Sequence, residues 1–365
     1  MIHIPSLAGQ KVDVFGLGRS GLSSAIALQR SGAKVLAWDD NEAGLEKARA
    51  AGITPVDLYQ EDWEDISALV LSPGIPLTHP EPHRVTQLAR QAGIEIIGDM
   101  ELLARGDLQA RTIGITGTNG KSTTTALIGH VLARGGEKVE VGGNLGVPVL
   151  DLMPLDEDGA YVLEMSSYQL DLIRTLSFDI AVLLNISPDH LDRHGGLEGY
   201  VAAKEQIFEG QGELDVAIVA IDDEACRQIG ENLKGKRKVI PISGEAVAPG
   251  GVYVQDGKLY DDIDGQAELI IDLGDVASLP GVHNAQNATA AYAVAKVQGV
   301  ETQKIVTGLK TFPGLAHRQE LLAVIDGVSY VNDSKATNDE AAARALACYG
   351  DIYWIAGGKA KESGL

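Results

Sequence analysis

The feature that most constrains the fold is a glycine-rich loop between a strand pattern and a helix pattern. Residues 112–116 (TIGIT) predict a buried strand, residues 117–122 read GTNGKS, and a helix is predicted over 121–134. In this context backbone N–H groups and a helix N-terminus can surround phosphate oxygens. The pattern predicts an α/β protein whose ligand lies beyond the carboxyl ends of parallel strands.

The residue types in this loop suit a nucleoside triphosphate. Lys121 can reach the β- and γ-phosphates as a point charge, and the Ser122 hydroxyl can be a ligand of Mg²⁺. The strict pattern G-x-x-x-x-G-K-[ST] is not met, because Ile115 stands where its first glycine belongs. A capped turn with a solvated lysine is the alternative interpretation. The nucleotide contacts expected from the loop are Gly117, Thr118, Asn119, Gly120, Lys121, Ser122 and Thr123.

Three α/β segments follow one another along the 365 residues, a length that suggests two or three domains. We expect a Rossmann-like domain over 1–98, a central P-loop domain with a parallel sheet over 99–313, and the start of a C-terminal Rossmann-like domain over 314–365. In the first segment we expect strands at 11–18, 33–38, 67–72 and 95–98, and helices at 20–31 and 83–92. In the second we expect strands at 112–116, 161–166, 179–187 and 215–221, a hairpin at 251–262, and helices at 121–134, 198–208, 284–298 and 302–310. In the third we expect strands at 328–333 and 352–358 around a helix at 338–348.

A second glycine-rich turn, GLGRSG over residues 16–21, follows the first predicted strand. It matches G-x-G-x-x-G, and Asp39 lies 18 residues beyond Gly21. In isolation this motif indicates an NAD site. The same turn could hold the diphosphate of a UDP-sugar at the helix N-terminus, or it could serve packing alone.

Polar residues near the ends of two central strands could complete a metal site. Glu164 falls late in the predicted strand 161–166, and Asp189 and His190 follow the next strand. Because the carboxyl ends of parallel strands meet at one edge of a sheet, these side chains are expected near the phosphate loop. A carboxylate there suits Mg²⁺, whereas each residue alone could be a paired carboxylate or a loop histidine.

Four residues further along the chain are weaker candidates. Lys204 lies on the helix after His190 and could be a surface lysine. Asn284 and Asn287 lie three residues apart, so they could cap a helix or bind a purine or ribose. Arg318 follows Pro313-Gly314 and could be solvated, or could reach phosphate charge when domains close.

The charge and the cysteine content exclude several classes of protein. A net charge of −21 repels phosphate backbones and anionic membranes. The sequence has two cysteines, Cys226 and Cys348, far apart, so neither a disulfide framework nor a zinc site is indicated. The N-terminus shows no secretory pattern, and no apolar run reaches membrane-spanning length. We expect a cytoplasmic, monomeric enzyme without nucleic-acid or membrane partners.

Taken together, these segments resemble the Mur ligase family along the whole chain. The family-like segments are TGTNGKS (116–122), LEMSSYQ (163–169), NISPDHLDRH (185–194), YVAAKEQIF (200–208), GVHNAQNA (281–288) and GLAHRQE (314–320). The glutamate-adding members are similar in GLGRSGLS (16–23), LSPGIP (71–76), GGNLG (142–146) and NDSKATN (332–338). The resemblance implies a ligase that joins D-glutamate to UDP-N-acetylmuramoyl-L-alanine through an acyl phosphate, using ATP and two Mg²⁺ ions, in peptidoglycan synthesis.

The resemblance also implies a role for each candidate residue. ATP would be bound by the phosphate loop together with Asn287, Arg318 and Asp333. The UDP-sugar would be bound by Gly18, Ser20, Asp39, Ser72, Gly74, Asn144 and His190. The metal ligands would be Ser122, Glu164, His190 and Lys204, the last as a carbamate formed with CO₂. Lys121, His190, Lys204 and Arg318 would be catalytic, and Lys335, Thr337 and Lys361 would lie toward the incoming glutamate.

The sequence departs from the family pattern at two places. After the second strand it reads Asp39-Asp40-Asn41, where the best-known members carry a threonine and an arginine. The sequence also stops at Leu365, before the segments expected to hold the glutamate carboxylates, so we expect an incomplete third domain and poor turnover.

Three other functions stay open. Another ligase of the same scaffold, such as one that extends folate, is disfavoured by the GLGRSG turn. An NAD-dependent dehydrogenase would leave the phosphate loop unexplained. A P-loop switch would turn over ATP without forming an amide.

Overall fold

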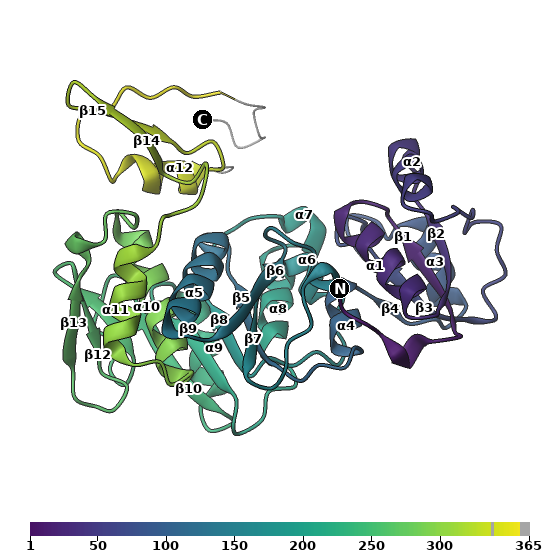
Figure 1. The fold of residues 1–365 in the computed structure, drawn as a ribbon, viewed down its shortest axis with the longest axis horizontal. Helices are drawn as coiled ribbons and strands as arrows, with labels where there is room; N and C mark the ends of the chain where they lie inside the picture. Colours follow the sequence, from purple (N-terminus) through teal and green to yellow (C-terminus); the bar gives the residue numbers. More distant parts are fainter. Residues whose placement is uncertain (337–338, 358–365) are drawn as a thin grey trace. The chain divides into compact units, whose positions relative to one another are not determined.

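The computed structural model describes residues 1–336 and 339–357 (Figure 1). The chain divides into two compact units. The first unit contains Met1–Thr125 and Gly136–Ile240, and the second contains Ala126–Gly135 and Pro241–Leu365. Helix α5 (Lys121–Gly135) begins in the first unit, and its last ten residues belong to the second.

A four-stranded parallel sheet forms the N-terminal part of the first unit. Its order is β2-β1-β3-β4, with β1 (Lys11–Phe15), β2 (Lys34–Trp38), β3 (Ile66–Leu71) and β4 (Ile96–Ile97). The connecting helices are α1 (Arg19–Arg30), α2 (Glu42–Ala50) and α3 (Arg84–Gln91). The chain leaves β1 toward β2 and leaves β3 toward β4, so the topological switch point, where ligands bind in such sheets, lies between β1 and β3.

A second parallel sheet in the same unit carries the phosphate loop. Its order is β9-β8-β5-β7-β6, with β5 (Arg111–Thr116), β6 (Lys138–Gly143), β7 (Gly159–Glu164), β8 (Ile180–Leu183) and β9 (Val216–Ala220). The helices around it are α4 (Asp99–Ala104), α6 (Ser167–Leu170), α7 (Leu191–His194), α8 (Leu197–Glu205) and α9 (Glu224–Leu233). Strands β7, β8 and β9 are buried along their whole length, as continuous apolar runs predict for a sheet covered on both faces.

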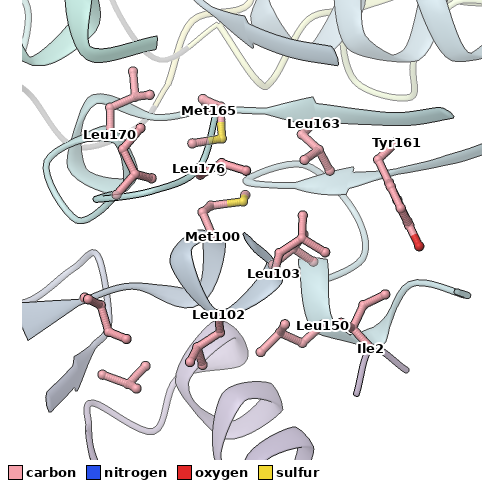
Figure 2. Close-up of a cluster of buried hydrophobic side chains, with 14 of the residues drawn as sticks. Ile2, Met100, Leu102, Leu103, Leu150, Tyr161, Leu163, Met165, Leu170 and Leu176 are labelled. Atoms are coloured by element: carbon pink, nitrogen blue, oxygen red, sulfur yellow. The ribbon is translucent and has the colours of Figure 1, made fainter. Parts of the chain in front are cut away.

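Helix α4 joins the two sheets of the first unit through apolar side chains on opposite sides of a short helix. Figure 2 shows Met100 pointing toward Met165 and Leu176, whereas Leu102 extends from the other side of the helix. Met100, Leu102 and Leu103 are all fully buried in one continuous core. The glycine-rich turn and the phosphate loop are therefore carried by domains that share a packed core.

The strands of the second unit, together with β10, which begins in the first unit, differ in direction. Strands β10 (Lys238–Ser243) and β11 (Val252–Gln255) run parallel, whereas β12 (Lys258–Asp261) and β13 (Glu268–Asp272) continue antiparallel. Helices α10 (Val282–Val297) and α11 (Thr302–Thr311) follow. The chain then forms an antiparallel pair, β14 (Glu320–Ile325) with β15 (Val328–Asn332), and helix α12 (Asp339–Leu346).

Several predictions of secondary structure are confirmed and two are wrong. The hairpin at 251–262 forms, with Asp256 and Gly257 at φ of 50° and 73° in its turn. The sheet expected for residues 99–313 is mixed and not wholly parallel, because β12 and β13, which belong to it, pair antiparallel. The expected strand at 352–358 is absent over its described part, 352–357, where Tyr353 and Ile355 are 98% and 97% exposed. An apolar run forms a strand only where a neighbouring strand accepts its hydrogen bonds.

Candidate active site

The loop between β5 and α5 is held in shape by the segment that follows β8. The Thr118 N–H donates to the Asn185 carbonyl at 2.8 Å, and the Asn119 N–H donates to Asn185 Oδ1 at 2.8 Å. Thr118 Oγ1 donates to the Ser187 carbonyl at 3.1 Å. At Gly117 a Cβ would lie 3.0 Å from the Leu184 Cβ, so the close packing requires glycine. The loop has a defined shape that its own backbone and Asn185 maintain.

Two lysine amines share one acceptor in this loop. Lys121 Nζ donates to the carbonyls of Gly117 and Thr118 at 2.9 and 2.8 Å, and Lys204 Nζ donates to the Gly117 carbonyl at 2.7 Å. Lys204 is 1% exposed, and its Nζ lies 4.6 Å from the centroid of the Tyr200 ring. Burial, with the Lys121 charge nearby, lowers the pKa of Lys204 well below its ordinary value. The alternative of a surface Lys204 is therefore wrong.

Glu164 lies at the end of β7, next to β5, and is 2% exposed. Its Oε1 accepts a hydrogen bond from Asn144 Nδ2 at 2.6 Å, and its backbone carbonyl accepts one from the Asn144 N–H at 3.0 Å. Its Oε2 is buried and has no hydrogen-bond partner among the described residues. A buried carboxylate oxygen without a donor is a group that a cation would satisfy. The structure thus brings Asn144, a predicted substrate contact, onto Glu164, a predicted metal ligand.

One histidine precedes helix α7 and another ends it, and the two differ in their surroundings. His190, the residue before α7, adopts a left-handed backbone with φ of 53°, and its side chain is 47% exposed. Its ring lies 5.2 Å from the ring of Tyr168. His194 is buried, with Ser167 Oγ 2.9 Å from its Nε2 and an Asp171 oxygen 3.3 Å from its Nδ1. His190 is therefore the histidine that a ligand can reach, whereas His194 holds the local structure.

The donor set at this edge of the sheet fits Mg²⁺ bound together with phosphate oxygens and water. In residues 1–336 and 339–357, no three His, Cys, Asp or Glu side chains gather closely enough to hold a metal on their own. Magnesium in phosphate sites takes only one or two protein oxygens, because it keeps several waters and the substrate phosphates. The unpartnered Glu164 Oε2 and the Ser122 hydroxyl at the start of α5 are oxygens of that kind.

The N-terminal glycine turn and the loop after β3 lie on either side of the switch point. Ser72 Oγ donates to the Gly16 carbonyl at 2.6 Å. At Gly21 a Cβ would lie 1.8 Å from the Gly16 carbonyl oxygen, so helix and turn need glycine there. At Gly18 and Gly74, by contrast, a Cβ would meet nothing within 4 Å. These two glycines leave open space beside the N-terminus of α1, where a diphosphate could bind.

Asp39 and Asp40 follow β2 at the same edge. Asp39 Oδ2 accepts a hydrogen bond from the Leu17 N–H in the glycine turn at 2.5 Å, and its Oδ1 accepts one from the Asn41 N–H, before α2, at 2.8 Å. Asp40 accepts a hydrogen bond from the Tyr59 hydroxyl at 2.9 Å. Its Oδ2 also lies 3.2 Å from His83 Nε2. Asp40 belongs to the segment Asp39-Asp40-Asn41, which departs from the family pattern, and its carboxylate contacts the phenol of Tyr59 and the imidazole of His83.

The remaining candidates lie in the second unit. Asn284 donates to the Pro280 carbonyl at 2.7 Å, and Asn287 donates to Asn284 Oδ1 at 3.0 Å. Gly281 is the N-cap of α10 and makes no side-chain cap, so the capping interpretation of the two asparagines is wrong. Asp333 Oδ1 accepts from the Gln319 N–H at 3.0 Å, next to Arg318.

Of the three residues predicted to lie toward glutamate, one is described. The Lys335 N–H donates to the His317 carbonyl at 3.1 Å. Thr337 and Lys361 lie outside the described residues.

Sequence reasoning assigned no role to several residues that the structure places at the site. Asn185 shapes the phosphate loop, and Arg19 Nη2 donates to the Asn144 carbonyl at 3.1 Å. Arg193 binds the loop after β3. Each lies inside a segment that resembles the family, and this position was the one feature of the sequence that could have indicated a role at the site.

The fold and the site define the class of protein. A parallel sheet that carries a phosphate loop with two lysine amines on one carbonyl, and a buried carboxylate oxygen without a hydrogen-bond donor among the described residues, defines a nucleoside triphosphate-binding enzyme domain. Here that domain is joined to a Rossmann-like domain. In the part of the chain that the structure covers, none of the helices combines the length and apolarity needed to cross a membrane.

Comparison with known proteins identifies the family. The profile of the Mur ligase middle domain matches residues 115–295, and that of the Mur ligase MurD-like N-terminal domain matches residues 10–98. The chain is 50% identical over 373 aligned residues to the UDP-N-acetylmuramoylalanine--D-glutamate ligase of Caulobacter vibrioides, covering 100% of this chain and 79% of that protein. It is 49% identical to the enzyme of the same name from Rhodospirillum rubrum, covering 100% and 78%. The chain belongs to the Mur ligase family.

Solved structures share the fold at low sequence identity. A UDP-N-acetylmuramate:L-alanyl-gamma-D-glutamyl-meso-diaminopimelate ligase from Neisseria meningitides aligns with a TM-score of 0.57 at 20% identity, over 84% of this chain and 99% of that one. The UDP-N-acetylmuramate-alanine ligase MurC of Thermotoga maritima aligns with a TM-score of 0.57 at 19% identity, over 93% and 77%. These alignments support the α/β architecture of the family.

Proposed function

We propose that the chain catalyses the ATP-dependent joining of D-glutamate to UDP-N-acetylmuramoyl-L-alanine, a step of peptidoglycan precursor synthesis in the cytoplasm. The observation that carries the proposal is the 50% identity to a UDP-N-acetylmuramoylalanine--D-glutamate ligase across the whole chain. Two contacts support it: Glu164 ends β7 beside β5, which leads into the phosphate loop, and Lys204 Nζ donates to the Gly117 carbonyl of that loop. The enzyme would act as a monomer with three small-molecule substrates.

The reaction needs an activated carboxylate, because a carboxylate anion resists nucleophilic attack. An oxygen of the L-alanine carboxylate would attack the γ-phosphorus of ATP, and ADP would leave. The amine of D-glutamate would then attack the acyl phosphate carbon, form the amide bond, lose a proton and release inorganic phosphate. Lys121 from the phosphate loop and Arg318 from the second unit would offset the charge that develops on the transferred phosphoryl group.

Bound Mg²⁺ would neutralise phosphate charge and orient the oxygens of the transferred group. Ser122, Glu164 and His190 would hold it, and the buried Glu164 Oε2 supports that role because it lacks another partner among the described residues. Lys204 would contribute as a carbamate, formed when its neutral amine adds to CO₂ and loses a proton. The burial of that amine against Gly117 supports this step, because burial disfavours the ammonium form.

Substrate binding would be divided among three domains, residues 1–98, 99–313 and 314–365. The UDP-sugar would bind Gly18, Ser20, Asp39, Ser72, Gly74, Asn144 and His190, and the open space at Gly18 and Gly74 supports this placement. ATP would bind residues 117–123 with Asn287, Arg318 and Asp333. D-glutamate would bind Lys335, Thr337 and Lys361.

A matrix of substrates tests the proposal. Phosphate release is measured with ATP, each UDP-muramoyl precursor and each candidate amino acid, and only UDP-N-acetylmuramoyl-L-alanine with D-glutamate should support turnover. Equal turnover with ATP alone would favour a P-loop switch. Turnover with a folate acceptor would favour another ligase of the scaffold.

A further inference from the structure

Helix α7 of the central domain holds the loop that follows β3 of the N-terminal domain. Arg193 Nη1 donates to the Gly74 carbonyl at 3.1 Å, and its Nη2 lies 3.5 Å from the Pro73 carbonyl. The guanidinium carbon also lies 4.5 Å from the centroid of the Tyr168 ring. One side chain therefore joins two neighbouring backbone carbonyls of one domain to an aromatic face of the other.

A second contact ties the same two segments together. Gly195, just after α7, has φ of 71°, and a Cβ there would lie 2.7 Å from His79 Nε2. The loop after β3 thus meets α7 at Pro73-Gly74 and again at His79. A shallow depression between them is lined by Ile75, Leu77, Tyr168 and Arg193, among others. The loop after β3 is therefore fixed to the α7 region at two places.

The elements that Arg193 joins carry predicted ligands of different reactants. The loop contains Gly74, proposed to bind the UDP-sugar, and His190 lies three residues before Arg193, whose N–H donates to the His190 carbonyl at 3.0 Å. Thr118, which shapes the phosphate loop, bonds to Ser187 in the segment before α7. A continuous chain of contacts therefore leads from the UDP-sugar loop through Arg193 to the phosphate loop.

We infer that Arg193 is a positioning residue that sets the acceptor carboxylate against the γ-phosphate by fixing the loop after β3 to α7. The inference rests on the proposed function. A planar guanidinium can donate to two carbonyls while stacking on an aromatic ring, and a lysine ammonium cannot do both. Misplacement of a reacting group by about 1 Å can lower a rate about a hundredfold, so such a residue acts without touching substrate.

The test compares Arg193→Leu and Arg193→Lys with a matched control, Arg90→Leu. Arg90 lies on α3 and donates to the Leu77 carbonyl at 3.1 Å, so it holds the same loop from within the N-terminal domain. Steady-state kinetics are measured for all three substrates, with circular dichroism as a check on folding. For Arg193→Leu we expect KM for the UDP-sugar to rise about tenfold and kcat to fall about tenfold, with KM for ATP within about twofold. Arg193→Lys should lie between wild type and Arg193→Leu, and Arg90→Leu should stay near wild type.

Several results would overturn the inference. It fails if Arg193→Leu matches Arg90→Leu, or if kcat falls while every KM stays constant, as a smaller folded fraction would produce. If Arg193→Leu does not fold, wild-type kinetics in Arg193→Lys would refute it equally. If wild type shows no D-glutamate-dependent turnover, the proposed function fails instead. In that case, amide hydrogen exchange over residues 73–79 still tests the positioning role of Arg193. Unchanged exchange in the Arg193 variants would refute that role, and faster exchange would support it.

Discussion

Replacing Asp13 with asparagine should remove a pH-dependent loss of stability. Asp13 lies in the middle of β1, is 0% exposed, and neither of its carboxylate oxygens has a hydrogen-bond partner among the described residues. Burial raises the pKa of Asp13 from 3.8 to about 7. The charge of Lys11 opposes this rise, and the charge of Glu61 adds to it. The folded chain therefore binds a proton at Asp13 that the unfolded chain releases above pH 4.

The sign of the effect follows from that difference. Between about pH 4 and 7 the folded state holds more protons, so stability falls as pH rises, and above about pH 7 the loss is complete. A difference of about three pH units corresponds to at most ~4 kcal/mol at about 1.4 kcal/mol per unit. Asparagine has nearly the same shape and also lacks partners, so it removes the charge alone. Asp13→Asn should be more stable than wild type by about 1 kcal/mol near pH 4.5 and by about 2–4 kcal/mol at pH 8.

Urea unfolding followed by circular dichroism between pH 4.5 and 8 measures the effect. Asp65→Asn, at an exposed position, is the matched control for loss of one negative charge. Because other groups titrate in both proteins, the informative quantity is the difference between variant and wild type at each pH. A difference that is constant across the range, or that is equal for Asp13→Asn and Asp65→Asn, would refute the reasoning.

Three further predictions concern single side chains. Lys121→Ala should lower turnover at least a hundredfold (about 3 kcal/mol of transition-state stabilisation) with an unchanged circular dichroism spectrum, and near-normal turnover would show that the loop is not the ATP site. Lys204→Ala should be severely impaired and partly rescued by short carboxylic acids, whereas failed rescue and a mass spectrum with only an unmodified amine would exclude the carbamate. Glu101, fully buried, accepts from the N–H groups of Arg174 and Thr175 at 2.8 and 2.9 Å. Glu101→Gln should therefore lower the free energy of unfolding by about 2 kcal/mol in urea titrations, and an unchanged midpoint would contradict this.

Local patterns in the sequence predicted the elements that carry the site. The strand before GTNGKS and the helix after it form as expected, and Glu164 ends its strand at the same sheet edge. These features depend on periodicity over a few residues and on the geometry of parallel strands, both of which are local information. The resemblance to a family assigned roles to individual residues, because the order of the motifs can also be compared directly in the sequence.

Pairings between distant segments could not be predicted in the same way. Asn185 meets Asn119 across 66 residues, and Arg193 meets Gly74 across 119. Nothing local marks either partner, because each contact depends on how two segments pack. The strand expected at 352–358 is absent from 352–357 for a related reason, since a continuous apolar run indicates a buried strand but does not supply the neighbouring strand. At Asp13 the local pattern did predict the element, because its apolar neighbours in the sequence indicated the strand β1. The buried charge of Asp13 nevertheless lowers the stability of the fold.

The central claim is that ATP activates the carboxylate of the UDP-sugar before D-glutamate attacks it. It can be tested by labelling both oxygens of the L-alanine carboxylate with ¹⁸O and analysing the products by mass spectrometry. The account predicts that one ¹⁸O atom appears in the inorganic phosphate and the other stays in the amide carbonyl, because the attacking carboxylate oxygen leaves with the phosphoryl group. L-glutamate should give neither labelled phosphate nor amide. Unlabelled phosphate alongside the D-glutamate product, or phosphate release that does not depend on the UDP-sugar, would contradict the account.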